Sequence, residues 1–112
     1  MSNPQKIKGS AHERAVAQYL RERGYDKAQR RFGAGQQFDT GDVTGVKGVV
    51  IECKDQRKHE LAVWADETLC EKLNARADIG VLVVKRLRKP ITHAYAILSL
   101  EDLVTLLAEA GR

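Results

Sequence analysis

Apolar residues near the start of the chain recur at the spacing of an amphipathic helix. They predict a helix over residues 11–23, whose apolar face consists of Ala15, Val16, Tyr19 and Leu20. Ser10 precedes this helix as the expected N-cap, and Glu13 at the third helical position completes a capping box. Gly24 is the expected end of the helix. Residues 1–9 are polar and predict a flexible leader.

Strand patterns fill the stretch that follows. Residues 25–32 predict a first strand, and a Gly- and Gln-rich loop leads from it into a β-hairpin over 42–54. The turn of the hairpin lies within residues 45–48. A three-residue loop there suits a type I turn closed by Gly48 in the left-handed conformation. Residues 55–60 are hydrophilic and predict a loop.

A second helix is predicted over residues 63–76. Its apolar positions are Leu69 and Leu73, with Trp64 on a flank. The helix also contains Cys70, one of the two cysteines of the chain, and the other is Cys53 in the hairpin. Neither cysteine has the spacing of a zinc site, so we expect two buried, reduced thiols.

The last third of the chain predicts two strands and a helix. Residues 79–84 form a continuous apolar run, which is typical of a central strand covered on both faces. A short strand follows at 94–98, and Ser99 caps a final helix that extends through Ala110. The element order α-β-β-β-α-β-β-α predicts an α/β fold, with a mixed central β-sheet flanked by helices in a single domain of residues 1–112.

The loop length fixes which residues of the hairpin lie opposite one another. It pairs Gly45 with Val49 and therefore Asp42 with Glu52. Directly opposed residues share a face of the sheet, with Cβ atoms about 4.5–5.5 Å apart. Two carboxylates this close repel each other unless a cation or a proton lies between them. The register therefore predicts a metal site, whereas a two-residue loop would send Asp42 to the core face beside Cys53.

Successive residues of the second hairpin strand face opposite sides of the sheet. Glu52 and Lys54 point together, while Ile51 and Cys53 face the core. Carboxylates such as those of Asp42 and Glu52 suit Mg²⁺ or Mn²⁺, and the backbone carbonyl of Cys53 is a further candidate ligand. Glu-x-Lys alone is common and also describes an ordinary half-exposed strand. The correctly placed aspartate is what makes the combination specific.

Composition and charge narrow the class of protein. Of the 112 residues, 43% are hydrophobic and 30% are charged, as in ordinary soluble globular domains. No apolar run could span a bilayer and the N-terminus lacks the apolar core of a signal peptide, so we expect a cytoplasmic protein without a membrane partner. The net charge of +4 indicates a polyanionic partner, and 5% aromatic residues offer no platform for stacking single-stranded bases. We expect no small-molecule cofactor.

A series of short motifs runs through the first half of the chain. In order, they are Lys8-Gly9-Ser10-Ala11-His12-Glu13-Arg14, Gly24-Tyr25, Arg30-Arg31, Gly33-Ala34-Gly35, Asp42 and Glu52-Cys53-Lys54. This series resembles the PD-(D/E)xK nuclease superfamily, which has a restriction-endonuclease-like fold. Within the superfamily it looks most like the archaeal-type Holliday junction resolvases.

The resemblance implies a function and a role for each site residue. Asp42 and Glu52 are expected to hold Mg²⁺ or Mn²⁺, Lys54 to orient the attacking water or steady the phosphorane charge, and Glu13 to complete the site as a further acid and ligand. The protein is then a metal-dependent DNA endonuclease that acts on a four-way junction as a two-fold homodimer. The alternatives are a nuclease for a flap, a nick or a duplex, and a non-catalytic nucleic-acid-binding module.

The chain also departs from the family pattern. Gly41 stands where proline usually precedes the metal-binding aspartate, and a longer loop before it makes Asp39 a rival ligand to Asp42. Asp55-Gln56 follows Lys54 in place of a small hydroxyl residue. These differences leave the metal site intact but weaken the case for junction specificity.

Two further groups of residues are candidates for contacts with partners. Side chains expected to bind DNA around the catalytic edge are Lys8, Ser10, Arg30, Arg31, Arg57 and Lys58. A second basic cluster follows the central strand at its far end and consists of Lys85, Arg86, Arg88 and Lys89. Solvated loop charge explains this cluster as well as a DNA contact does. The last helix carries more apolar residues than one short face needs, among them Leu103, Leu106 and Leu107, which fits a homodimer, although core packing explains them as well.

Overall fold

The computed structural model describes residues 3–31 and 40–112. Along these residues the elements are α1 (Pro4–Glu22), β1 (Gln29–Arg30), β2 (Val43–Thr44), β3 (Val49–Lys54), α2 (Leu61–Ala75), β4 (Ile79–Val84), the 3₁₀ turn η1 (Ile91–His93), β5 (Tyr95–Ile97) and α3 (Leu100–Glu109). The predicted order of helices and strands is confirmed, with η1 as the one addition among the described residues. The first strand is much shorter than expected, since β1 has two residues.

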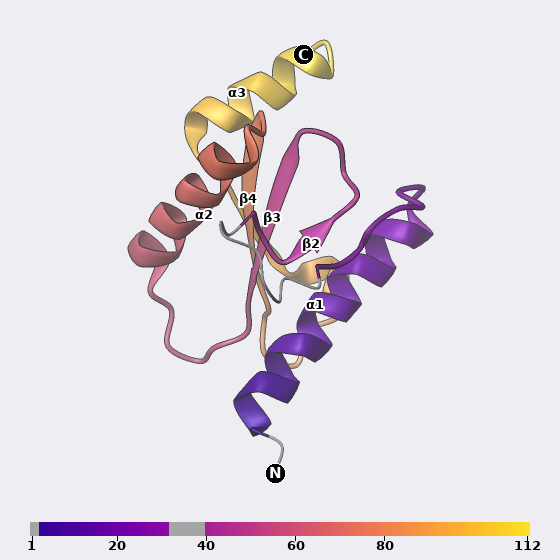
Figure 1. Ribbon diagram of the computed structural model, residues 1–112, viewed down its shortest axis with the longest axis vertical. Coiled ribbons are helices and arrows are strands. Elements are labelled where there is room, and N and C mark those ends of the chain that lie inside the picture. The colour runs from indigo at the N-terminus through magenta and orange to yellow at the C-terminus, as the bar shows by residue number, and fades with distance from the viewer. Residues whose placement is uncertain (1–2, 32–39) are drawn as a thin grey trace.

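The described strands form one five-stranded sheet in the order β1-β2-β3-β4-β5. The β3–β4 pair is parallel and the other pairs are antiparallel. Because β3 and β4 are parallel, α2 crosses between them over one face of the sheet, while α1 lies against the other face (Figure 1). The carboxyl ends of β3 and β4 therefore lie at the same edge of the sheet.

Each face of the sheet has its own apolar cluster. On the α1 face, Val16 and Ala17 pack against Val43, Ile51 and Cys53. On the α2 face, Trp64 packs against two residues of β4, and these are Leu82 and Val84. The apolar run of β4 is thus a buried central strand, as its sequence predicts. Among the described helices, none combines the length and the apolar character that crossing a membrane requires.

The N-terminal helix corrects the expected flexible leader. Helix α1 begins at Pro4, so residues 4–9 belong to it and are not a loose leader. Asn3 is the N-cap, and its side chain accepts a hydrogen bond from the backbone N–H of Gln5 at 3.0 Å. Proline suits the first helical turn because its missing N–H has no partner there. Ser10 is therefore inside the helix, and its predicted role as N-cap is wrong.

The hairpin has the predicted register. Val43 pairs with Ile51, which is the same alignment that sets Asp42 opposite Glu52. Gly48 has φ +74°, so the turn closes with a left-handed glycine as expected. Regular pairing ends at Val43, because the backbone N–H of Asp42 donates to the carbonyl of Ile51 at 2.7 Å instead of continuing the ladder. Beyond Ile51, β2 does not pair with β3, and the side chain of Asp42 accepts a hydrogen bond from the backbone N–H of Cys53 there.

Helix α3 is capped by a serine and is bound to the sheet through a buried aspartate. Ser99 caps α3 as predicted, accepting a hydrogen bond from the backbone N–H of Asp102 at 3.0 Å. Asp102 is buried, and its carboxylate accepts from Lys72 Nζ at 2.8 Å and from the backbone N–H of Gly80 at 2.9 Å. Helix α3 is therefore fixed to the sheet by a polar anchor.

In α2, Cys70 is exposed, so the expectation of two buried thiols is wrong for this residue.

Candidate active site

One cavity brings together the four residues expected to carry the chemistry. It has a volume of about 590 Å³, opens at the carboxyl end of β3, and is lined by Glu13, Asp42, Glu52, Cys53 and Lys54. The first of these comes from α1, the second from just before β2, and the others from β3. Three of the predicted DNA contacts stand on the rim of the same cavity, and these are Lys8, Arg57 and Lys58.

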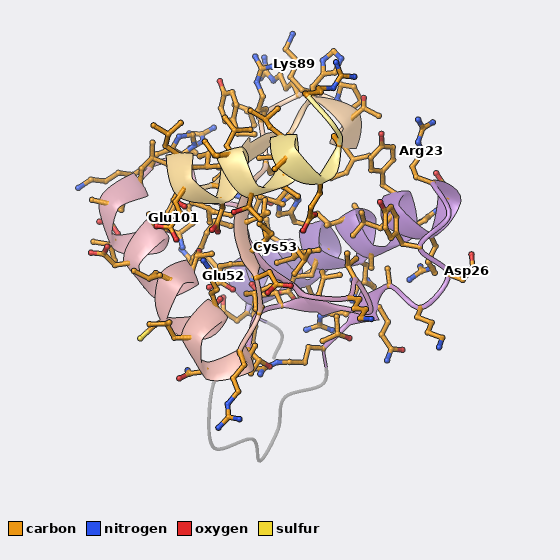
Figure 2. The ribbon with its side chains drawn as sticks, turned by 90° about the horizontal axis from the view of Figure 1, so that it is seen from above. Arg23, Asp26, Glu52, Cys53, Lys89 and Glu101 are labelled. Atoms are coloured by element: carbon orange, nitrogen blue, oxygen red, sulfur yellow. The ribbon has the colours of Figure 1, made fainter. Side chains whose placement is uncertain are left out.

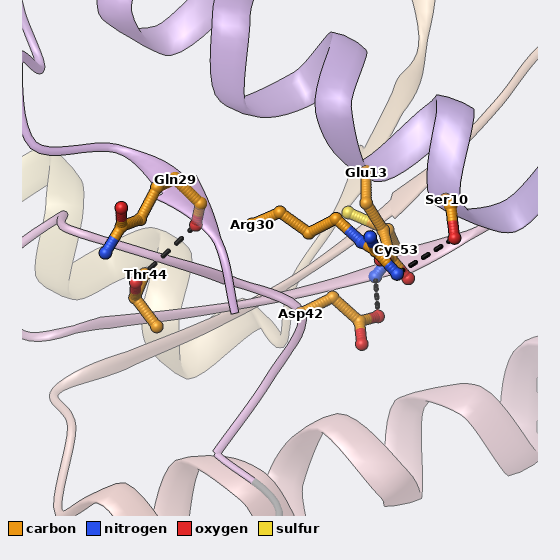
Figure 3. A network of polar contacts seen from close by, with 7 residues as sticks. All are labelled: Ser10, Glu13, Gln29, Arg30, Asp42, Thr44 and Cys53. Atoms are coloured by element: carbon orange, nitrogen blue, oxygen red, sulfur yellow. Dashed lines mark hydrogen bonds and ion pairs between the residues drawn. The ribbon is translucent and has the colours of Figure 1, made fainter. Parts of the chain in front are cut away.

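Asp42 and Glu52 lie side by side, as the register predicts. Oδ2 of Asp42 accepts a hydrogen bond from the backbone N–H of Cys53 at 2.8 Å, which fixes its carboxylate at the unpaired edge of β3 (Figure 3). Glu52 is 5% exposed and faces α2 (Figure 2). Burial, and then the hydrogen bond and charge of Asp42, raise the pKa of Glu52 to about 11. Without a cation, this pair of acids therefore holds a proton.

A third carboxyl group, which the sequence pattern did not single out, approaches from α2. Glu71 is 3% exposed, and its hydrogen bond and charge also contribute to the raised pKa of Glu52. The residues of α2 that face the sheet are Trp64, Thr68 and Glu71, spaced at i, i+4 and i+7. Leu69 and Leu73, taken from the sequence as the apolar positions of this helix, are exposed. Counting the helical spacing from the tryptophan finds Glu71.

Lys54 is held by a small group of residues from α2. Its Nζ lies 3.1 Å from Oε2 of Glu67 and 4.0 Å from Oε2 of Glu52. The same nitrogen is 5.8 Å from the centre of the Trp64 ring, within reach of a cation–π contact. Burial lowers the pKa of an ammonium group, but the hydrogen bond to Glu67 and the charges of the surrounding carboxylates outweigh it and leave the pKa of Lys54 raised. Lys54 is therefore a fixed positive charge beside the acids.

Glu13 enters the cavity already paired with a cation. Oε1 of Glu13 lies 2.6 Å from Nε of Arg30, whose Nη2 donates to Oγ of Ser10 at 2.9 Å (Figure 3). Its carboxylate therefore serves this contact and does not cap a helix. Two of the predicted DNA contacts, Ser10 and Arg30, do not line the cavity but position Glu13 there.

Arg31 holds the segment before Asp42 in place. Its backbone N–H donates to the carbonyl of Asp42 at 2.8 Å, and its Nη1 donates to Oγ1 of Thr40 at 3.1 Å. The rival ligand Asp39 lies outside the described residues. The structure thus positions Asp42 at the site through three backbone contacts, counting those to Ile51 and Cys53.

The chain matches the model of a known protein family. Residues 4–79 match the model of a family described as archaeal Holliday junction resolvase (Hjc), which is more than half of the chain. The chain belongs to this family. The family is part of the PD-(D/E)xK nuclease superfamily, so the predicted fold class is confirmed. No curated protein and no solved structure is similar enough to count as a match.

Membership of the Hjc family gives the general function of the chain. It is a nuclease of the Holliday junction resolvase type, and the family implies binding to DNA junctions. The match includes α1, the hairpin and α2, and ends at the first residue of β4. Among the residues that the structure describes, no group of three or more histidine, cysteine, aspartate or glutamate side chains is arranged to hold a metal ion.

Proposed function

We propose that this Hjc-family protein is a metal-dependent endonuclease that hydrolyses phosphodiester bonds in four-way DNA junctions. The observation that supports it best is the contact between Asp42 and the buried Glu52 beside the ammonium group of Lys54. Two acids that can hold a cation, beside a fixed ammonium group, suit phosphodiester cleavage, because the negative charge that develops on the phosphoryl oxygens must be neutralised while a water molecule is activated.

The donor set fits Mg²⁺ or Mn²⁺. Oε1 of Glu52 is buried and has no hydrogen-bond partner, and such an atom is costly unless something binds it. Mg²⁺ is commonly held by one or two carboxylates while it keeps several waters, so Asp42 and Glu52 suffice without a third acidic ligand. The N–H of Cys53 points toward Asp42, and the carbonyl of the same residue lies on that edge of β3, which makes it a third candidate ligand.

Each residue of the site has its own role in the proposed reaction. A bound divalent cation supplies a water of lowered pKa and neutralises charge on the phosphate. Lys54 places its ammonium group where it can orient the nucleophile or steady the phosphorane. Glu13 is a further candidate ligand, and Arg30 holds its Oε1 at the edge of the site. Phosphates next to the cut contact the basic side chains on the rim, which are Lys8, Arg57 and Lys58.

Resolution of a junction requires two cuts on opposite strands, and this needs two active sites. We therefore propose a two-fold homodimer. Helix α3 supports this, because it exposes a row of apolar residues along the surface, and these are Leu100, Leu103, Val104, Leu106 and Leu107. A continuous apolar face of this kind is unusual on a monomer and typical of an interface.

The proposal is tested by cleavage of a synthetic four-way junction and of a linear duplex of the same sequence, each with Mg²⁺ and with EDTA. We expect paired, symmetric cuts in the junction that require the cation and are lost in Asp42→Asn. Asp26→Asn is the matched control, because Asp26 is exposed and does not line the cavity. Equal cutting of both substrates indicates a nuclease for another DNA structure. Tight junction binding without cutting indicates a non-catalytic binding module.

A further inference from the structure

A second, strongly basic cavity adjoins the candidate active site. It has a volume of about 320 Å³, and the cations that line it are Lys8, Arg57, Lys85, Arg86 and Lys89. It shares Lys8, Asp55, Gln56 and Arg57 with the candidate active-site cavity, so the two cavities lie next to each other. We call this second cavity the basic groove.

The parallel pairing of β3 and β4 creates the groove. Lys54 pairs with Val84, and the backbone N–H of Lys85 donates to the carbonyl of Lys54 at 2.9 Å. The basic cluster after β4 therefore lies beside the loop after β3. The sequence predicts that this cluster lies apart from the catalytic edge, and that prediction is wrong.

One acidic residue orders two of the lysines of the groove. Oδ1 of Asp55 lies 3.4 Å from Nζ of Lys8, and its Oδ2 lies 3.8 Å from Nζ of Lys85. The side chain of Asp55 is 9% exposed, whereas both lysine side chains are 45% exposed. The aspartate thus sits beneath two ammonium groups whose remaining donors face solvent. It holds in place the charges that a phosphate can meet.

An arginine stacked on a tyrosine forms part of the same wall. Cζ of Arg86 lies 4.9 Å from the centre of the Tyr95 ring, and the tyrosine is exposed. Stacking holds the guanidinium plane in a fixed direction, which leaves its N–H groups arranged for bidentate contact with phosphate oxygens. A solvated loop would need no such arrangement.

We propose that the basic groove binds the sugar–phosphate backbone on one side of the scissile phosphate, so that the strand cut at Asp42 and Glu52 continues past Asp55 to Arg86. This inference rests on the proposed function and extends it to a second subsite. The cations neutralise phosphates, which carry no base sequence, so we expect binding at this subsite to be independent of sequence.

The test measures DNA binding in EDTA, where no metal-dependent cleavage takes place. The variant combines Lys85→Ala, Arg86→Ala and Lys89→Ala. The matched control removes three exposed cations outside both cavities, through Arg23→Ala, Lys27→Ala and Arg112→Ala. We expect the groove variant to bind a four-way junction more weakly than the control, with a slope of log K against log salt that is smaller by about 2–3. Equal affinities and slopes for the two variants would overturn the proposal.

Two more measurements locate the contact. Ethylation of single phosphates is expected to weaken binding of the wild type both at the cut and next to it, and the groove variant should lose only the effect next to the cut. Arg86→Lys keeps the charge but not the planar stack, so its salt slope should stay the same while its affinity falls. Loss of the ethylation effect at the cut alone would place the groove on another segment and contradict the inference.

The inference and the proposed function fail separately. If Mg²⁺ produces no cleavage while the groove variant still lowers the salt slope, the proposed catalytic function is wrong and the DNA subsite stands. If the wild type cuts junctions but the groove variant binds like its control, the subsite is wrong and the nuclease stands. Thermal unfolding of each variant checks that the fold is intact, and Lys85→Gln with Lys89→Gln repeats the test if the alanine variant unfolds.

Discussion

The carboxylate of Asp42 accepts a hydrogen bond from the backbone N–H of Cys53, with 2.8 Å between Oδ2 and that nitrogen. The side chain of Asp42 thus takes the hydrogen bond that a neighbouring strand would otherwise make with β3 at Cys53. The bond satisfies a backbone donor and at the same time holds the carboxylate next to Glu52. Because β2 begins only at Val43, the edge of β3 beside Cys53 stays open for the carboxylate, and a strand that began earlier would cover it.

Glu52→Gln is expected to abolish cleavage while the protein still binds junctions. The amide keeps the shape of the side chain but is a poor ligand for a divalent cation. We expect the rate to fall on the order of 100-fold or more, since changes even to outer-shell partners cost 10–100-fold. Junction binding should be equal to or tighter than that of the wild type, because one carboxylate fewer faces the phosphates. Single-turnover cleavage with Mg²⁺ measures this, and a native rate would exclude Glu52 as a ligand.

Mg²⁺ is expected to stabilise the wild type and not the Glu52→Gln variant. In the metal-free protein the pKa of Glu52, raised to about 11 mainly by burial, keeps its carboxyl protonated at neutral pH, so the neutral amide should change the free energy of unfolding little. A cation at 100 times its Kd adds about 2.7 kcal/mol to the folded state that binds it. Urea unfolding with Mg²⁺ and with EDTA compares the two proteins. An equal gain in both would show that the cation binds elsewhere.

Glu67→Gln is expected to slow cleavage by about tenfold without weakening DNA binding, because it removes the partner that orients Lys54, in the way an outer-shell change does. The two side chains are joined at 3.1 Å, and Glu67 is partly exposed, so the cost in stability should stay below about 1 kcal/mol. Separate measurement of kcat and KM on a junction tests this, and Glu67→Asp should recover part of the rate. A fall in stability together with an unchanged kcat would assign the glutamate a structural role only.

Asp102→Ala is expected to release α3 from the sheet. The residue is buried and bound by Lys72 and by the backbone of Gly80, and leaving these donors without an acceptor costs about 2 kcal/mol. Urea unfolding measures the loss, and hydrogen exchange should show it first in α3. Full protection of α3 in the variant would contradict the anchor.

The same carboxylate predicts how stability changes in acid. Burial would raise the pKa of Asp102, but the hydrogen bonds from Lys72 and Gly80 outweigh it and leave the pKa below its usual value. An acid with a lowered pKa in the folded state stabilises the protein above its unfolded pKa, near 3.8, and loses that contribution as the pH falls through the folded value. Asp102→Asn should therefore unfold with a weaker pH dependence below about pH 4 than the wild type.

The parts of the site set by local geometry were predictable from the sequence. The loop length and Gly48 predicted the hairpin register, and with it the proximity of Asp42 and Glu52, because a one-residue change would reverse every side chain. The start of α1 had a local signal too, since Asn3 followed by Pro4 is a helix beginning. The polar composition of residues 1–9 obscured it, although a helix end exposed to solvent needs no apolar residues.

The parts that depend on packing between distant segments were not predictable in the same way. Which face of α2 meets the sheet decides that Glu71 is buried and that Glu67 reaches Lys54, and the exposed leucines of this helix point to the wrong face. The position of the basic cluster beside Asp55 depends on β3 and β4 being parallel. A strand, a helix and a further strand favour that arrangement, but only the sheet order shows which loops become neighbours.

Leu103→Glu is expected to separate the proposed homodimer into monomers that bind DNA but no longer make paired cuts. A charge within an apolar interface is left without a partner, whereas on a free helix surface it is harmless. Sedimentation measures the mass, and a cruciform plasmid distinguishes nicking from paired cleavage. Ile7→Glu, at an exposed apolar residue of α1, is the matched control for the mass. A dimer that survives Leu103→Glu and Leu107→Glu together would show that another face of the protein forms the interface.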